Sequence, residues 1–340
     1  MKKALFIGGT GTISAAITRL VSKDPEWELF LLNRGNRTSS VPEGVKLIQA
    51  DIKNEEDVSA KLQGMHFDCV CDFIAFHVSD VERDWRIFHG KTEQYIFISS
   101  ASAYRKPVTN HIITEETPLS NPYWLYSREK AACEKFLMDR YGEGYPVTIV
   151  RPSHTYDERK LPLGVHGDKG SWQIAKRMLE GKPVIIHGDG SSLWTLTHNT
   201  DFAVGFKGLM GNPKALGEAF HITSDESLSW NQIYQCIADA LGVELKACHV
   251  ASDFLIATGR YDLTGTLLGD KACSVVFDNS KLKKLVPEFN PSIKYSEGAR
   301  MTVEYILQHP ELQQEDPEFD KWCDEVILAQ EKAKEYFKTI

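Results

Sequence analysis

A glycine-rich turn directly after a short apolar run is the feature that most constrains this chain. The run Lys3-Ala4-Leu5-Phe6-Ile7 ends at Gly8-Gly9-Thr10-Gly11, and the apolar positions that follow have helical spacing (Ile13, Ala16, Ile17, Leu20, Val21). This order predicts a buried strand, a tight turn and a helix. Glycines let the backbone turn sharply, and the unpaired N–H groups that open a helix favour a phosphate. We therefore expect a dinucleotide pyrophosphate site here.

The pattern G-x-x-G-x-x-S also fits a strand-to-helix turn without a ligand, because glycine-rich turns after strands are common. Its place after the first strand favours the binding site. Ser14 stands where a third glycine would let helix and strand pack closely, and a small serine costs little there.

Apolar runs alternate with helical patterns along the first half of the chain. Strands are predicted at 27–32, 45–50, 69–74 and 94–98, and helices at 55–62 and 78–88. Such alternation is typical of a parallel sheet covered by helices on both faces. Ligands of these sheets bind beyond the carboxyl ends of the strands, so the residues that follow each run are the candidates for binding.

The residues after the second predicted strand bear on the cofactor. An acid near this point holds the ribose 2′-OH of NAD, whereas an arginine accommodates the 2′-phosphate of NADP. Here Asn33-Arg34-Gly35 and then Arg37 occur, with no acid. We favour NADP, and two solvated loop arginines are the alternative. Asp51-Ile52, after the third strand, either contacts the adenine or supplies a cap for the next helix.

A tyrosine and a lysine on one helical face are the candidates for proton transfer. Tyr126 and Lys130 are four residues apart in a predicted helix that runs to about Tyr141. An ammonium beside a phenol lowers the phenol pKa towards neutrality, and such a tyrosine exchanges a proton with a substrate hydroxyl. Pairs with this spacing also occur by chance on many helices.

The combined pattern is similar to that of a known family. The Gly8/Gly11 turn, Ser100 four residues before Tyr104, and the Tyr126/Lys130 pair occur in the order and spacing of the short-chain dehydrogenase/reductase superfamily. The chain resembles its extended branch, the NAD(P)-dependent sugar epimerases and dehydratases, over residues 1–308. Later segments match as well: Val150-Arg151-Pro152, Gly188-Asp189-Gly190 with Asp201-Phe202, Phe220-His221-Ile222, residues 274–281, and Glu297-Gly298 with Val303-Glu304-Tyr305.

The resemblance implies roles for individual residues. Tyr126 would be the acid/base, Lys130 would bind the nicotinamide ribose and lower the tyrosine pKa, and Ser100, with Ser102 as the alternative, would bond the reacting oxygen. The remaining cofactor contacts would come from the pyrophosphate turn, the ribose side and the adenine side: Gly8, Thr10, Gly11, Thr12, Ile13, Asn33, Arg34, Asp51, Ile52 and Ala75.

Two departures from the family pattern bear on the substrate. Ala101 and Ser102 stand where the dehydratases carry an acidic pair, so the general acid for eliminating water is missing. Dehydration is therefore a less favoured reaction than epimerisation or reduction. His154 replaces an asparagine and Trp194 an arginine that hold the diphosphate of nucleotide sugars. Losing a charge-assisted phosphate contact weakens the case for a nucleotide-linked sugar. Trp194 offers a stacking surface for a sugar, with a core or rim tryptophan as the alternative.

These features predict a doubly wound parallel-sheet Rossmann fold with a smaller C-terminal substrate-binding subdomain. Residues 1–151, with returning segments of the second half, would bind the cofactor, and 152–340 would mainly hold the substrate. The expected function is an NAD(P)-dependent epimerase or reductase acting on a hydroxyl of a sugar-like substrate. The alternative is a non-enzymatic NADP sensor or RNA-binding protein, since the chain also resembles chloroplast stem-loop RNA-binding proteins near residues 33–35 and 188–190.

Composition bears on partners and compartment. The net charge is −8 with no basic cluster, which argues against nucleic acid as a partner. No apolar run approaches a membrane span, the seven scattered cysteines fit reduced thiols, and the first apolar run is too short for a signal peptide, so we expect a cytoplasmic protein. The histidines are too dispersed to suggest a metal site. A charged helix from about Pro317 packs on its own subunit or on a partner, and a homodimer is one such assembly.

Overall fold

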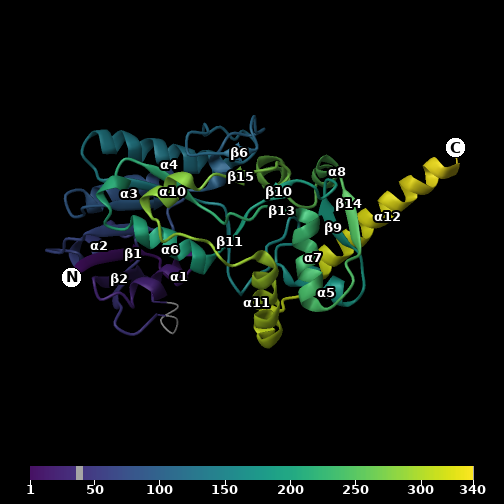
Figure 1. Ribbon diagram of the computed structural model, residues 1–340, viewed down its shortest axis with the longest axis horizontal. Helices are drawn as coiled ribbons and strands as arrows, with labels where there is room; N and C mark the ends of the chain where they lie inside the picture. The colour runs from purple at the N-terminus through teal and green to yellow at the C-terminus, as the bar shows by residue number, and fades with distance from the viewer. Residues whose placement is uncertain (36–40, 340) are drawn as a thin grey trace.

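The computed structural model describes residues 1–35 and 41–339. A seven-stranded sheet forms one half of the molecule (Figure 1), and every neighbouring pair of its strands is parallel. The strand order is β12-β7-β5-β4-β1-β2-β3. Their bounds are β1 Lys2–Ile7, β2 Trp27–Asn33, β3 Lys46–Gln49, β4 Cys69–Asp72, β5 Tyr95–Ile98, β7 Val147–Pro152 and β12 Ala219–Ile222.

Alternate side chains of each strand enter two different cores, as a pleated strand requires. On β1, Ala4 and Phe6 join the core beneath one set of helices, while Leu5 and Ile7 join the core beneath the other. Both faces of the sheet are therefore covered, and the predicted doubly wound fold is confirmed. The helices of the first face are α1 Thr12–Val21, α6 Asn199–Leu209 and α10 Ser280–Leu285, and those of the second are α2 Glu55–Lys61, α3 Val78–Phe88 and α4 Leu125–Gly142.

The second half of the chain builds a separate core beside the sheet (Figure 1). Its main helices are α5 Trp172–Leu179, α7 Trp230–Leu241, α8 Ser252–Ala257, α9 Thr264–Thr266, α11 Tyr295–Gln308 and α12 Pro317–Thr339. Its short strands pair as β14 Ala247–Val250 with β9 Val184–His187, β10 Leu193–Trp194 with β13 Leu228–Ser229, and β11 Leu196–His198 with β8 His154–Tyr156. A further pair, β6 Ile112–Ile113 with β15 Val276–Phe277, joins the two halves of the sequence.

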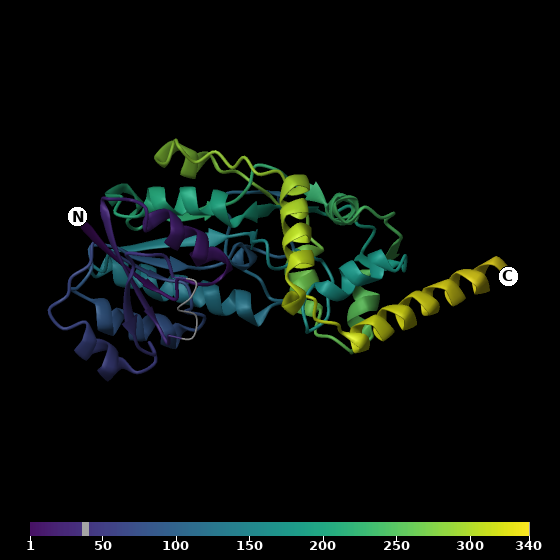
Figure 2. The ribbon, with the colours of Figure 1, turned by 90° about the horizontal axis from the view of Figure 1, so that it is seen from below.

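Several predicted element ends agree with the structure. Helix α3 has the predicted bounds. Ser229 caps α7 by accepting a hydrogen bond from the amide of Gln232. Helix α12 begins at Pro317, as expected, and its distal half projects away from the rest of the molecule (Figure 2). In the described part of the chain, no helix combines the length and apolarity needed to cross a bilayer. The boundary at residues 151 and 152 remains a prediction.

Candidate active site

A cavity of about 650 Å³ opens at the carboxyl ends of β1, β2, β3 and β4, where ligands of such sheets bind. Seven of the residues predicted to contact a dinucleotide line it: Gly8, Thr10, Gly11, Asn33, Arg34, Asp51 and Ile52. Sequence reasoning missed a second set on the same wall, which includes Ser14, Lys53, Phe73, Ile74 and Phe76.

The turn at the base of this cavity requires glycine. Gly8 and Gly9 have φ values of +105° and +89°, and a Cβ on Gly9 would lie 2.6 Å from Cδ2 of Leu31. The turn is held by Thr18, whose Oγ1 donates to the carbonyl of Gly9 over 2.8 Å. The first amides of α1 lack an intrahelical acceptor, as at any helix start. The cradle therefore fits a diphosphate group.

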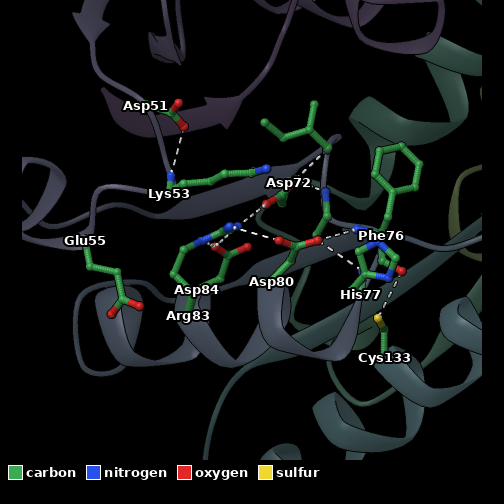
Figure 3. A network of polar contacts seen from close by, with 12 residues as sticks. Asp51, Lys53, Glu55, Asp72, Phe76, His77, Asp80, Arg83, Asp84 and Cys133 are labelled. Carbon is green, nitrogen blue, oxygen red and sulfur yellow. Dashed lines mark hydrogen bonds and ion pairs between the residues drawn. The ribbon is translucent and has the colours of Figure 1, made fainter.

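The parts of the cavity wall that would contact the ribose and the adenine are formed by residues at the ends of β2 and β3. Arg34 is exposed on the wall of the cavity, and Asn33 accepts a hydrogen bond from the amide of Gly35 over 2.9 Å. Arg37 lies outside the described residues. Asp51 accepts from the amide of Lys53 over 3.0 Å (Figure 3).

Asp51 does not cap the next helix. The cap of α2 is Asn54, whose side chain accepts from the amide of Asp57 over 3.2 Å. The capping alternative is thus wrong, because the chain makes one more turn before the helix begins.

The cavity wall at residues 73–77 is held by two carboxylates, those of the buried Asp72 and the half-buried Asp80 (Figure 3). Oδ1 of Asp72 accepts from the amides of Ile74 and Ala75 over 2.5 and 2.8 Å, and Asp80 accepts from those of Phe76 and His77 over 2.9 and 3.0 Å. Every amide from residue 74 to residue 77 is therefore bound. The fixed wall leaves Ala75 buried beneath its neighbours, so Ile74 and Phe76, rather than Ala75, line the cavity.

Arg83 ties these carboxylates together. Its guanidinium donates to Asp84 over 3.0 and 2.8 Å and to Asp80 over 3.1 Å, and it lies 3.8 Å from Oδ2 of Asp72 (Figure 3). The second oxygen of Asp84 accepts from the Tyr95 hydroxyl over 2.6 Å. Burial and then the charge of Asp84 raise the pKa of Asp72 well above its usual value. Asp72 therefore holds a proton more readily than an ordinary aspartate.

The predicted catalytic residues meet beside this wall. Ser100 follows β5, while Tyr126 and Lys130 lie on α4. Nζ of Lys130 donates to the carbonyls of Ala75 and Ile98, each over 2.7 Å, and lies 5.8 Å from the centre of the Tyr126 ring. The structure thus brings the three predicted residues together.

The pKa of Tyr126 differs from the sequence-based expectation. Burial raises it, a hydrogen bond with Ser100 lowers it, and the charge of Asp270 raises it. The expected lowering by Lys130 is wrong for this structure, because the ammonium is directed to two backbone carbonyls. Burial also lowers the pKa of Lys130 to about 8, although the charge of Asp72 acts in the opposite direction.

A second cavity, of about 290 Å³, has Ser100 and Tyr126 on its wall. All three predicted substrate residues, Ser102, His154 and Trp194, line it as well. Oγ of Ser102 lies 2.9 Å from that of Ser100 and accepts from the Ser127 hydroxyl over 2.8 Å, so the two candidate serines form one hydrogen-bonded chain.

Trp194 forms part of the core behind this cavity. Its side chain is 3% exposed, and its ring centre lies 5.7 Å from that of Trp230 with the planes tilted by 30°. Its indole Nε1 donates to Nδ1 of His154 over 3.4 Å. Burial lowers the pKa of His154 to about 3, so this imidazole is neutral near pH 7. These contacts favour the core alternative for Trp194.

Two charged residues of the cavity wall were missed from sequence. Asp270 and Lys271 end a π-helical turn, Leu267–Lys271, and both line the cavity. The carbonyl of Lys271 accepts from Nε2 of His187, Oγ of Ser192 and Nε1 of Trp230, each over 3.1 Å. A turn of five residues is too short to show a periodic pattern of apolar residues, so it could not be predicted in that way. The only nearby signal in the sequence is the match of the following segment, 274–281, to the family pattern.

A third cavity, of about 300 Å³, adjoins the second through His154 and Lys271. Thr12 and Ile13 line this third cavity and not the first cavity, which contains the glycine turn. Their predicted contact with the pyrophosphate side therefore remains a prediction. The segment 157–166 supplies much of its wall, including Lys160, Leu161 and His166.

Comparison with known proteins relates this geometry to a family. The model of the NAD dependent epimerase/dehydratase family matches residues 4–223. The chain is 24% identical over 302 residues to 2'-dehydrokanamycin reductase of Streptomyces kanamyceticus, which covers 84% of this chain and 80% of that protein. It is 26% identical over 256 residues to the chloroplast stem-loop binding protein of 41 kDa b of Arabidopsis thaliana, covering 71% and 64% of the two chains.

Solved structures share the fold. UDP-glucuronic acid 4-epimerase from Bacillus cereus, in complex with UDP-glucuronic acid and NAD, has a TM-score of 0.71 at 21% identity and covers 90% of this chain and 99% of its own. dTDP-glucose 4,6-dehydratase from Bacillus anthracis, in complex with NAD, has a TM-score of 0.71 at 17% identity, with 92% and 98% covered. At these identities the likeness is one of fold alone.

Proposed function

The chain belongs to the NAD-dependent epimerase/dehydratase family, and we propose that it is an NAD(P)-dependent oxidoreductase that interconverts a hydroxyl and a carbonyl group of a sugar-like substrate. One observation carries the proposal. Ser100 and Tyr126 line one small cavity, and Lys130 connects Tyr126 to the wall of the glycine-floored cavity. The proposed proton-transfer groups thus lie between the smaller cavity, which would hold the substrate, and the larger one, which would hold the dinucleotide.

The residues of the larger cavity fit a nicotinamide dinucleotide. Gly8, Gly9 and Gly11 would hold the pyrophosphate, because they line the larger cavity directly before the start of α1, whose first amides lack an intrahelical acceptor. Asp51 and Ile52 would contact the adenine. Arg34, exposed on the wall with no acid beside it in sequence, would pair with a 2′-phosphate, which favours NADP. When bound, the nicotinamide would accept or supply the hydride.

The protein's own residues would manage the proton. Tyr126 would transfer it to or from the substrate oxygen, and Ser100 would donate a hydrogen bond to the same oxygen. Lys130, whose Nζ lies 5.8 Å from the centre of the Tyr126 ring, would bind the nicotinamide ribose beside the site of proton transfer.

Two observations support carbonyl reduction as the main direction. Burial raises the pKa of Tyr126 and so favours the protonated phenol, the form that protonates a carbonyl oxygen. The Streptomyces relative named above is a reductase. An epimerase would use the same residues, with the keto intermediate retained and turned before the second transfer.

The test is turnover with a panel of keto-sugars and sugar alcohols, monitored by nicotinamide absorbance and by NMR of the products. A reductase consumes one NADPH per product, whereas an epimerase shows product without net consumption. Loss of turnover in Tyr126→Phe with retained NADP⁺ binding supports the proposal. Full activity in that variant contradicts it.

A second candidate function is RNA binding, which the similarity to the chloroplast stem-loop binding protein suggests. The net charge of −8 opposes it, because RNA affinity depends on a basic face. Salt-dependent retention on an RNA column, unchanged in Tyr126→Phe, would favour this candidate. The predicted homodimer also remains a proposal, and size-exclusion chromatography with light scattering tests it.

A further inference from the structure

The third cavity is a chamber of about 300 Å³ next to the catalytic cavity. One side is formed by the segment 154–166, and the other by the start of α1 and by Lys271. His154 and Lys271 belong to the walls of both cavities. A substrate whose reacting group lies at Tyr126 could therefore extend a second group into this chamber.

Two lysines, Lys160 and Lys271, line this chamber. Burial lowers the pKa of both Lys160 and Lys271, and the charge of Lys271 lowers that of Lys160 further. Across the part of the chain that the structure describes, neither lysine forms an ion pair. The acid on the same wall, Asp157, is already bound by Arg159 over 2.9 Å. Asp270 acts on Lys271 through its charge, without a hydrogen bond.

His154 adds a neutral donor to the same wall. Its Nδ1 accepts the indole hydrogen of Trp194 over 3.4 Å. An indole nitrogen only donates, so the proton of the neutral imidazole must be on Nε2. Burial, and then the charges of Lys271 and Lys160, lower the pKa of His154, and all three residues line the chamber.

Lys271 is also held in place. Three side-chain donors fix its carbonyl, and the residue is 9% exposed. A buried cation without a hydrogen-bonded counter-charge is costly, and an oxyanion that bonds it removes much of that cost. The backbone of Lys271 is thus fixed, and its buried ammonium would be stabilised by a negatively charged group.

We propose that Lys160, Lys271 and Nε2–H of His154 bind one compact oxyanion of the substrate, a phosphate or a carboxylate, while the reacting hydroxyl or carbonyl lies at Tyr126. That the bound molecule is the substrate rests on the function proposed above. The substrate class is then an acidic sugar.

Calorimetric titration of inorganic phosphate into the full-length protein tests the site, in the presence of saturating NADP⁺ and in its absence. Lys271→Met and Lys160→Met should each weaken phosphate binding about tenfold or more, since each removes a charge-assisted hydrogen bond. Lys271→Arg should largely restore it, and Lys332→Met, on the exposed face of α12, should leave it unchanged. Unchanged affinity in both lysine-to-methionine variants would overturn the proposal, as would the absence of saturable phosphate binding in the wild type. If Lys271→Met fails to fold, Lys160→Met decides the matter alone, because Lys160 is the more exposed of the two residues.

Displacement of the bound phosphate identifies the source of the oxyanion. Competition by glucose 6-phosphate but not by glucuronate indicates a phosphate, and the reverse indicates a carboxylate; either result supports the site. Tighter competition by UDP than by both would overturn the assignment of a single compact oxyanion. Phosphate binding requires no turnover, so a protein that binds phosphate through these lysines but shows no Tyr126-dependent activity would contradict the proposed function and leave the anion site standing.

Discussion

Nζ of Lys130 donates to the carbonyl oxygen of Ala75 over 2.7 Å, which links the catalytic helix to the wall of the dinucleotide cavity. The amide of the same alanine donates to Oδ1 of Asp72 over 2.8 Å. One peptide segment thus stands between the proposed proton-transfer machinery and the buried carboxylates beneath the wall. Displacing that segment should affect cofactor binding and the placement of Lys130 together.

The pKa of Lys130 predicts an alkaline limit to activity. Burial lowers this pKa from 10.5 to about 8, so the ammonium is present below that pH and is lost above it. We expect kcat/KM, which reports the free enzyme, to fall as the pH rises through about 8. In Lys130→Met the rate should be low at every pH, and the alkaline limb should disappear. A limb that persists in this variant would assign it to another group.

Tyr126→Phe should lower turnover by about 10²–10⁴-fold, because general acid–base catalysis contributes this much. The dissociation constant of NADP⁺, measured by fluorescence quenching, should change little. Tyr141→Phe is the matched control, since Tyr141 lies on the same helix with 40% of its surface exposed. Equal losses in both variants would indicate a structural effect and not a catalytic one.

Arg34→Ala should weaken NADP⁺ about tenfold or more and NAD⁺ only slightly, because only the former carries a 2′-phosphate for the guanidinium to pair with. Calorimetric titration of both cofactors measures the difference. Arg300→Ala, at an exposed position of α11, serves as the control. Equal effects of Arg34→Ala on the two cofactors would rule out the proposed 2′-phosphate contact.

The local and periodic parts of the fold could be predicted from sequence. The glycine turn, the alternating strands and the Tyr126/Lys130 spacing each depend on neighbours within one or two turns, which a sequence displays directly. The candidate site was also largely predictable where residues follow strand ends, as at Asn33, Asp51 and Ser100. These positions meet because parallel strands end at the same edge of a sheet.

Contacts between distant segments could not be predicted in this way. Asp72 and Arg83 lie close together because the short segment 73–77 joins β4 to α3. Their spacing in the sequence does not indicate a buried ion pair. Asp270 and Lys271 reach the cavity on a π-helical turn with no apolar period. The raised pKa of Tyr126 reflects burial, which depends on packing from both halves of the chain.

Arg83→Met should lower the free energy of unfolding by about 3–5 kcal/mol, because it leaves the carboxylate of Asp84 buried without its partner. Urea denaturation measures the change. Arg86→Met, one turn along α3, removes an exposed pair with Glu55 and should have little effect. If the two variants unfold at the same urea concentration, the buried network is not a stabilising element.

UDP and dTDP alone should bind weakly, with dissociation constants above about 1 mM. Trp194 stands where the family carries an arginine for the diphosphate, and its ring is packed against Trp230 and buried. Calorimetry with each nucleotide provides the measurement. Tight binding of UDP would restore a nucleotide-linked sugar as the substrate.

The three donors that hold the carbonyl of Lys271 belong to the second half of the chain, whereas Tyr126 lies on a helix packed against the sheet. Removing one of these hydrogen bonds, for example by Ser192→Ala, should therefore raise KM and leave kcat unchanged. Substitutions around the carbonyl oxygen of Lys271 would then change which acidic substrate is bound during evolution, without changing the chemical step at Tyr126.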